Sequence, residues 1–202
     1  MNILRYTLLT DGSSDTCLIP IINWLIGVHY PHINYEHQFA RNLGEIGFDL
    51  DTRVRVSLNL FPSDVLFIHR DSEKEPMNVR LKEINDATES LSNVIPVIPI
   101  RMSEAWLLSD EKAIREAVGN RNGKINLSLP AKKEWEKLPD PKRVLFEAMT
   151  KATEKSGRAL EKFNPNRHRI RVSELTENFS NLRGLESFDR FESRFVEVFK
   201  KI

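Results

Sequence analysis

Several features common in other protein classes are missing from this chain of 202 residues. It has one cysteine, Cys17, so it cannot form an internal disulfide. No apolar run reaches the roughly 18 residues of a membrane-spanning helix, and the first residues lack the pattern of a secretory signal. No glycine-rich phosphate loop is present, which argues against nucleotide hydrolysis by this chain alone. We therefore expect a cytoplasmic protein that does not enter the membrane.

The net charge of +1 hides a local basic excess. Hydrophobic residues make up 40% of the chain and charged residues 29%, as in ordinary globular proteins. Residues 1–101 contain 9 Lys and Arg against 13 Asp and Glu, whereas residues 120–171 contain 14 against 6. Such a basic segment can attract the phosphates of a nucleic acid. It is equally compatible with helices that present a solvated charged face.

The spacing of apolar residues predicts strands and helices in alternation. Strands are expected at 3–10, 33–40, 65–68 and 93–100, and helices from 16 onward and at 78–91, while 49–60 fits a helix or a strand. Further helices are expected at 103–110, 111–118, 142–163 and 185–200, with a linker at 130–141. This order predicts an α/β fold with a mainly parallel, Rossmann-like sheet flanked by helices. We expect an α/β core at 1–118 and a basic, mostly helical extension at 119–202 packed on it.

Two further details of packing follow from the sequence. Pro96 and Pro99 each lack a backbone donor, so the strand at 93–100 should lie at an edge of the sheet or end early. In the last predicted helix, Phe188, Phe191, Phe195, Val196 and Phe199 form one apolar stripe, which we expect to face the core.

Acidic residues follow several of the predicted strands. Asp11 ends the first strand, Asp71 follows the buried run Val65–Ile68, and Glu104 follows the strand at 93–100. The carboxyl ends of parallel strands meet at one edge of the sheet, where α/β proteins bind ligands. Carboxylates that converge there repel one another unless a cation lies between them. Oxygen ligands of this kind suit Mg²⁺ or Mn²⁺.

Each of these acids also has a local explanation, which for Asp71 is the capping of a loop. Asp11 precedes Gly12, so its carboxylate can bond the backbone of its own turn. Asp15 and Glu104 lie near predicted helix starts, where a negative charge stabilises the helix dipole. Glu73 belongs to the solvated run Glu73-Lys74-Glu75. What favours a site over these local roles is the shared position at strand ends.

Three stretches together resemble a known motif series. They are Leu-Leu-Thr-Asp-Gly-Ser-Ser-Asp, Leu-Phe-Ile-His-Arg-Asp-Ser-Glu and Ile-Pro-Ile-Arg-Met-Ser-Glu-Ala-Trp-Leu-Leu, between Leu8 and Asp110. The series is similar to that of a TOPRIM-like family of domains of unknown function, related to the OLD (overcoming lysogenisation defect) nucleases. In that family one strand ends in Glu-Gly-x-x-Asp/Glu, a second ends in Asp-x-Asp, and a later acid opens a helix.

The resemblance implies a set of site residues. The metal ligands would be Asp11, Asp15, Asp71, Glu73 and Glu104, of which Asp11, Asp71 and Glu104 would be catalytic. Two positions depart from the family pattern, because Asp11 replaces the usual Glu and His69 replaces the first Asp of Asp-x-Asp. Histidine suits Mn²⁺ better than Mg²⁺, or it orients a neighbouring ligand.

The implied function is that of a divalent-metal-dependent nuclease in a bacterial defence system. Residues expected to bind the nucleic acid are Arg70, Lys142, Arg143, Arg167 and Arg169. The alternative is a catalytically degenerate TOPRIM-like module that binds nucleic acid or an ATPase partner protein. A phosphate-accepting receiver domain fits less well, because no lysine is suitably placed. The sequence leaves open whether the chain forms a homo-oligomer.

Overall fold

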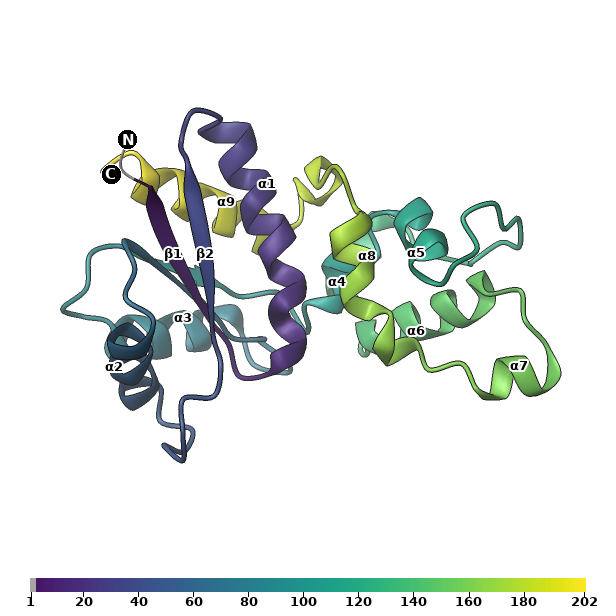
Figure 1. The fold of residues 1–202 in the computed structure, drawn as a ribbon, viewed down its shortest axis with the longest axis horizontal. Coiled ribbons are helices and arrows are strands. Elements are labelled where there is room, and N and C mark those ends of the chain that lie inside the picture. Colours follow the sequence, from purple (N-terminus) through teal and green to yellow (C-terminus); the bar gives the residue numbers. More distant parts are fainter. Residues whose placement is uncertain (1–2) are drawn as a thin grey trace.

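A computed structural model describes residues 3–202 and contains a parallel four-stranded sheet. The strands follow the order β2-β1-β3-β4, with β1 at Leu4–Leu9, β2 at Tyr35–Ala40, β3 at Val65–His69 and β4 at Val94–Val97. The register places Leu9 beside Ile68 and His69 beside Val97, so β1, β3 and β4 end at the same side of the molecule. The predicted parallel α/β fold and the edge position of β4 are confirmed (Figure 1).

Helices connect the strands, as parallel neighbours require. They are η1 at Ser13–Leu18, α1 at Ile19–His29, α2 at Leu50–Leu60 and α3 at Met77–Ala87. The ambiguous segment 49–60 is thus helical, and the side chain of Asp49 caps it by accepting the Thr52 amide at 2.9 Å. Helix α3 ends at Ala87, four residues before the predicted end.

The remainder of the chain is helical apart from its loops. The elements are α4 at Glu104–Leu107, α5 at Glu111–Ala117, η2 at Lys132–Lys137, α6 at Pro141–Ala152, α7 at Gly157–Glu161, η3 at Pro165–Arg167, α8 at Arg169–Leu175, η4 at Ser180–Leu182 and α9 at Glu186–Phe199. The prediction of one helix over 142–163 was wrong. The chain leaves the helix after α6, because Glu154 and Gly157 adopt left-handed backbone conformations with φ of 52°. The expected linker contains η2 with a buried Trp135, and α8 was not predicted.

Each face of the sheet is covered by two helices. Helices α2 and α3 cover one face, where Leu9, Leu66 and Ile68 are buried. Helices α1 and α9 cover the other, where the Phe67 ring lies 6.3 Å, between centroids, from both Phe191 and Phe195. The phenylalanines of α9 are buried as predicted, and Val196 is partly buried.

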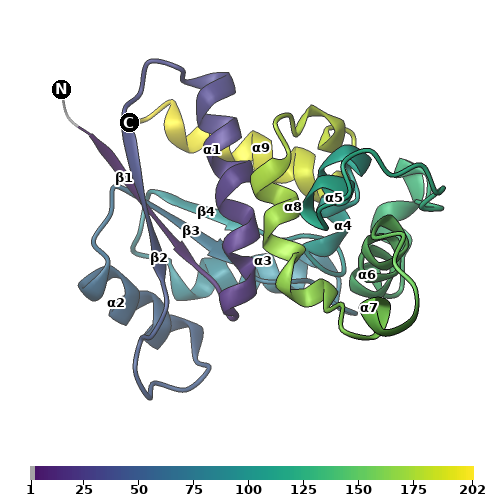
Figure 2. The ribbon, with the colours of Figure 1, turned by 45° about the vertical axis from the view of Figure 1, so that its right-hand side comes forward.

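The core on the α1 and α9 side continues into a helical lobe formed by α4 to α8 (Figure 1). Helix α8 lies beside α1 and contacts η1, the turn that follows β1 (Figure 2). Trp106 of α4 is buried, and its ring nitrogen donates to Ser187 of α9 at 3.1 Å. The lobe therefore brings α8 next to the strand ends. Within residues 3–202, no helix is both long enough and apolar enough to cross a bilayer.

Candidate functional site

The candidate site lies between the carboxyl ends of β1 and β3. In the order β2-β1-β3-β4, the chain runs from β1 to one neighbour and later returns to the other side of β1. Such a reversal opens a crevice at the strand ends, which is where open α/β sheets bind ligands. The turn after β1 supplies Asp11 and Asp15, and the end of β3 supplies His69 and Asp71.

His69 forms the centre of an acidic cluster. Its imidazole is buried, and Nδ1 lies 3.0 Å from the carbonyl oxygen of Val97. Because a carbonyl only accepts, Nδ1 carries a proton and Nε2 is left for other partners. Nε2 lies 3.5 Å from Asp71 Oδ1 and 3.9 Å from Asp15 Oδ2. Two acids that are 56 positions apart in the sequence thus face one imidazole nitrogen.

Asp71 is the acid most perturbed by this arrangement. Burial raises the pKa of Asp71 to about 6, and the nearby carboxylates of Asp15 and Glu104 add to the increase. His69 and the Ser103 amide, which donates to Asp71 Oδ1 at 2.9 Å, act in the opposite direction. A raised pKa shows that negative charge at this position is incompletely compensated by the protein.

Asp15 combines a local backbone contact with a place in the cluster. Its Oδ2 accepts the Gly12 amide at 3.2 Å, which closes the turn after β1. The same oxygen is the one that faces His69. Asp15 therefore both closes this turn and faces the cluster.

Asp11 takes a different environment, although it lies at the same edge. Its carboxylate is 48% exposed and pairs through Oδ1 with Arg53 at 2.8 Å and Arg70 at 3.3 Å. Arg53 also donates to the Thr10 carbonyl at 2.7 Å, and Arg70 pairs with Glu83 at 2.9 Å. Arg53, which reaches the site from α2, is not among the site residues predicted from the sequence.

Glu104 is also neutralised by an arginine. It is buried at the start of α4 and forms an ion pair with Arg169 of α8. Within residues 3–202, the Arg169 Nε is a buried donor without a hydrogen-bond partner. Arg169 was expected to bind nucleic acid, but its side chain is only 9% exposed, so that contact would require the pair to open.

Cys17 lies near the same acids. Burial raises the pKa of its thiol, and the charges of Asp15 and Glu104 raise it further. The thiol therefore stays protonated and unreactive at neutral pH.

The other predicted residues lie outside the cluster. Glu73 is exposed, with φ of 54° and its amide bonded to the Arg101 carbonyl at 2.9 Å. On α6, Lys142 lies over the Phe146 ring and Arg143 pairs with Glu147 at 3.2 Å. Arg167 is exposed on η3.

The chemical types of the donor atoms suit a divalent cation, but the distances between them do not. Asp15, His69 and Asp71 offer two carboxylates and an imidazole whose other nitrogen is anchored to a carbonyl, as in metal-binding histidines. Yet within residues 3–202, no three His, Cys, Asp or Glu side chains are arranged to hold an ion as they stand. Binding would require the two carboxylates to move toward Nε2.

Comparison of the chain with protein-family models, curated proteins and solved structures found no match.

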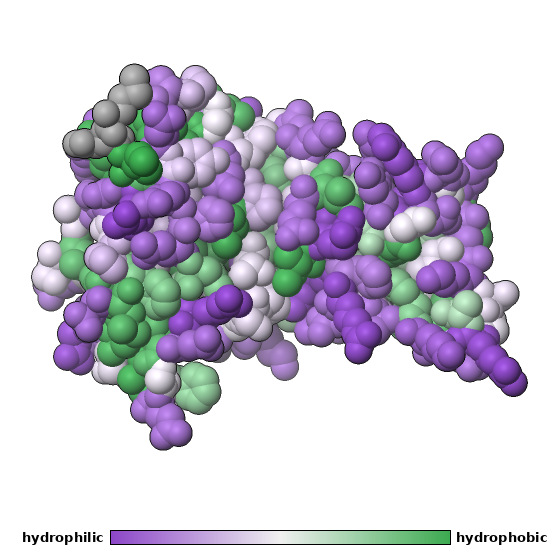
Figure 3. Space-filling view, viewed as in Figure 1, coloured by the Kyte–Doolittle hydropathy of each residue, from purple (hydrophilic) through white to green (hydrophobic). Residues whose placement is uncertain are grey.

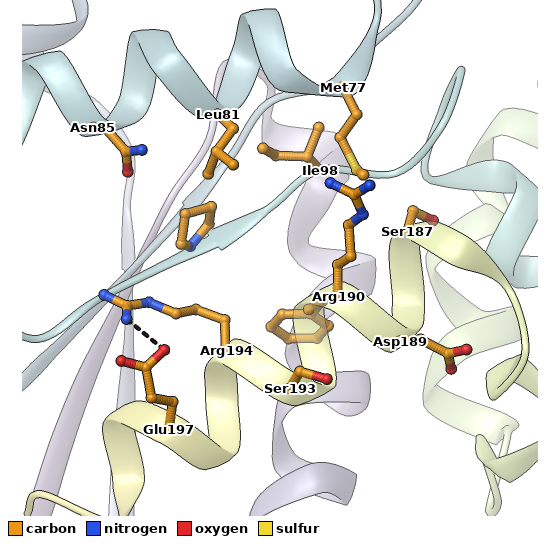
Figure 4. A pocket seen from close by; sticks show the side chains of 12 residues that line it. Met77, Leu81, Asn85, Ile98, Ser187, Asp189, Arg190, Ser193, Arg194 and Glu197 are labelled. Atoms are coloured by element: carbon orange, nitrogen blue, oxygen red, sulfur yellow. Dashed lines mark ion pairs between the residues drawn. The ribbon is translucent and has the colours of Figure 1, made fainter.

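A separate cavity of about 660 Å³ lies beside the edge strand, between α3 and α9 (Figure 4). Leu81, Ile98 and Phe191 contribute apolar walls. Arg194 crosses it, donating to the Val94 carbonyl at 3.3 Å and pairing with Glu197 at 2.8 Å. Arg194 thus covers part of the exposed edge of β4, a common protection against strand pairing. None of the acids of the cluster lines this cavity.

Proposed function

We propose that the protein is a divalent-metal-dependent nuclease whose cation binds between Asp15, His69 and Asp71. The observation that carries the proposal is the convergence of these groups at the reversal point of a parallel sheet. The raised pKa of Asp71 supports it, because an added cation would supply the compensation that the protein does not. Mn²⁺ is the better fit, because one of the three donors is an imidazole.

A bound cation supplies polarisation of the scissile phosphate and a water of lowered pKa. The chain's own part is to hold the ligands in place. The Val97 carbonyl fixes the His69 ring, and the Ser103 amide fixes Asp71. Such supporting hydrogen bonds typically change metal affinity or activity by roughly 10- to 100-fold when lost.

Arg70 is the residue placed to bind the substrate phosphate. It lies at the end of β3, next in sequence to His69 and Asp71, and its partner Asp11 is half exposed. A phosphate can replace a carboxylate as the partner of a guanidinium, because both offer oxygens in a matching geometry. The exposed basic residues Lys142, Arg143 and Arg167 would then contact more distant parts of the nucleic acid.

Glu104 would join the cation only after exchange with Arg169. The resemblance to OLD-type nucleases implies a ligand at this position, whereas Glu104 pairs with Arg169 here. We propose the pair as the state that precedes cation binding. A role in bacterial defence rests on the resemblance alone, and a plating assay with phage, comparing cells with the wild-type gene and with the Asp71→Asn gene, tests it.

The direct test is cleavage by the purified protein. Plasmid, single-stranded DNA and RNA are incubated with Mg²⁺ or Mn²⁺, using wild type, Asp15→Asn and Asp71→Asn. Loss of a ligand should remove several kcal/mol of transition-state stabilisation, or on the order of 10³-fold in rate. Asp86→Asn is the matched control, because Asp86 is exposed on α3 and pairs with Lys82. Absence of cleavage by wild type with either ion, or equal cleavage by Asp71→Asn, contradicts the proposal.

A second candidate is a catalytically degenerate module that binds nucleic acid or an ATPase partner. It is favoured by the arginine partners of Asp11 and Glu104, which neutralise these acids without a cation. Calorimetric titration with Mn²⁺ separates the two candidates. If the protein is a nuclease, it binds Mn²⁺ and Asp71→Asn abolishes this binding. If it is a degenerate module, it shows no specific Mn²⁺ site and binds nucleic acid equally well in EDTA.

A further inference from the structure

A cavity of about 410 Å³ lies next to Asp11, on the β2 side of β1. Its lining includes the turn after β1, the end of β2 and the loop over residues 41–49 that leads to α2. Arg53, which binds Asp11, forms part of the same wall. The cavity thus adjoins the strand ends at which we place the reaction, but none of Asp15, His69 and Asp71 lines it.

The loop over residues 41–49 exposes a large aromatic side chain. Phe48 is 87% exposed, the highest exposure among the large hydrophobic residues of the described chain. Gly44 and Gly47 flank the middle of the loop with φ of 85° and 69°, conformations that favour glycine. The loop between β2 and α2 projects from the lower left of the molecule, where hydrophobic and hydrophilic residues lie together (Figures 1 and 3). An exposed Phe at the rim of a cavity beside a candidate active site suggests a ligand with a flat apolar face.

Charges of both signs accompany this aromatic surface, because Asp11 and Glu45 line the cavity beside Arg41 and Arg53. Arg41 is exposed and lines the cavity, and it forms no ion pair with any residue in 3–202. Phe39 supplies a second ring to the lining, and Asn42 a side-chain amide. An aromatic platform beside an unpaired guanidinium and next to a phosphate-reactive centre matches the parts of a nucleotide, namely base and phosphate. Aromatic and arginine side chains also occur at protein contacts, and self-association is therefore one outcome of the test.

We infer that this cavity binds an unpaired base of a single-stranded nucleic acid, with Phe48 stacked on the base and Arg41 paired with the adjacent phosphate. The inference rests on the proposed function for the placement of the scissile phosphate, and it names single-stranded nucleic acid as the substrate class. Base stacking on an aromatic ring tolerates any sequence, because every base has a flat face. A duplex cannot use the cavity without giving up a base pair.

The test measures binding without catalysis. Wild-type protein in EDTA is titrated into a fluorescent single-stranded oligonucleotide that contains 2-aminopurine, and anisotropy and base fluorescence are followed. Phe48→Ala should weaken binding roughly 5- to 150-fold, the range expected from the stacking of one base, and should abolish the quenching of 2-aminopurine. Phe48→Trp should retain both. Ile125→Ala, which truncates a 50% exposed residue outside this loop, is the matched control and should bind as wild type.

Three results would overturn the inference. They are unchanged binding by Phe48→Ala, equal affinity of wild type for a duplex of the same sequence, and no binding of any oligonucleotide by wild type. In the last case, self-association that Phe48→Ala abolishes would identify the ring as a protein contact. The proposed function fails separately. If 2-aminopurine is quenched in EDTA but no cleavage occurs with Mn²⁺, the base-binding inference is supported and the proposed nuclease function is contradicted.

Discussion

Two pairs of acids lie at the same edge of the sheet and are treated differently by the fold. Asp11 and Glu104 each pair with an arginine, from α2 and α8 respectively. Asp15 and Asp71 instead face His69, at distances too long for strong hydrogen bonds. The first pair is compensated within the chain, whereas the second is the one that an added cation would compensate. The difference separates acids that are paired with arginines from the two acids that the proposed function assigns to the cation.

The largest expected effect comes from breaking the ion pair between Glu104 and Arg169. Arg169→Leu leaves Glu104 buried without its partner, and such changes cost about 3–5 kcal/mol of folding free energy. Urea denaturation at neutral pH measures the loss. The double variant with Glu104→Leu should recover most of it, because the unpaired charge is then gone. A single variant as stable as wild type would show that Glu104 does not depend on Arg169.

The next effect is a pH dependence of the free energy of unfolding that is caused by Asp71. The carboxyl of Asp71 has a pKa of about 6 in the folded protein against an ordinary value of 3.8, and His69, Asp15 and Glu104 are the titratable groups that face it. As the pH rises from about 4 to above 6, Asp71 ionises more readily in the unfolded chain, so stability is lost. At about 1.4 kcal/mol per pKa unit the loss reaches about 3 kcal/mol.

Asp71→Asn should not show this loss of stability with rising pH, because asparagine does not ionise. In EDTA its free energy of unfolding should match wild type near pH 4 and exceed it near pH 8, as denaturation at several pH values would show. Asp86→Asn, at an exposed site, should follow wild type throughout. A difference between Asp71→Asn and wild type that stays constant with pH would contradict the raised pKa.

A cation should stabilise the folded protein only through Asp15 and Asp71. At a concentration 100 times its dissociation constant, a bound ion adds about 2.7 kcal/mol to stability. We therefore expect Mn²⁺ to raise the Tm of wild type but not of Asp15→Asn or Asp71→Asn. Asp11→Asn should keep the response, because Asp11 is held by Arg53 and Arg70. If Asp11→Asn also loses the rise in Tm with Mn²⁺, Asp11 belongs to the same cation site as Asp15 and Asp71.

The smallest effect is at the surface. Arg143 pairs with Glu147 at 3.2 Å in the exposed part of α6. Arg143→Ala should change the free energy of unfolding by about 0.5 kcal/mol or less, since exposed i,i+4 pairs contribute little. A loss comparable to that of Arg169→Leu would remove the distinction between buried and surface pairs.

The sequence predicted the sheet better than the charge partners. The buried run before His69 and the prolines of β4 indicated the strands, and the acids after three of them indicated the edge at which these acids lie. The partners of Asp11 and Glu104 were not predictable, because Arg53 and Arg169 lie 42 and 65 positions away and reach the site only through the packing of α2 and α8. The break between α6 and α7 had a visible signal in Ser156-Gly157, which the apolar spacing outweighed.

The pairing of Phe67 with α9 has a consequence for how the chain is made. Phe67 belongs to β3, but the rings that cover it, Phe191 and Phe195, follow only after the whole of residues 98–185. During synthesis a ribosome-bound chain can thus pair its four strands while one side of the sheet still lacks part of its cover. Such an intermediate would expose aromatic surface on that side, and exposed apolar surface of this kind favours aggregation before folding is complete.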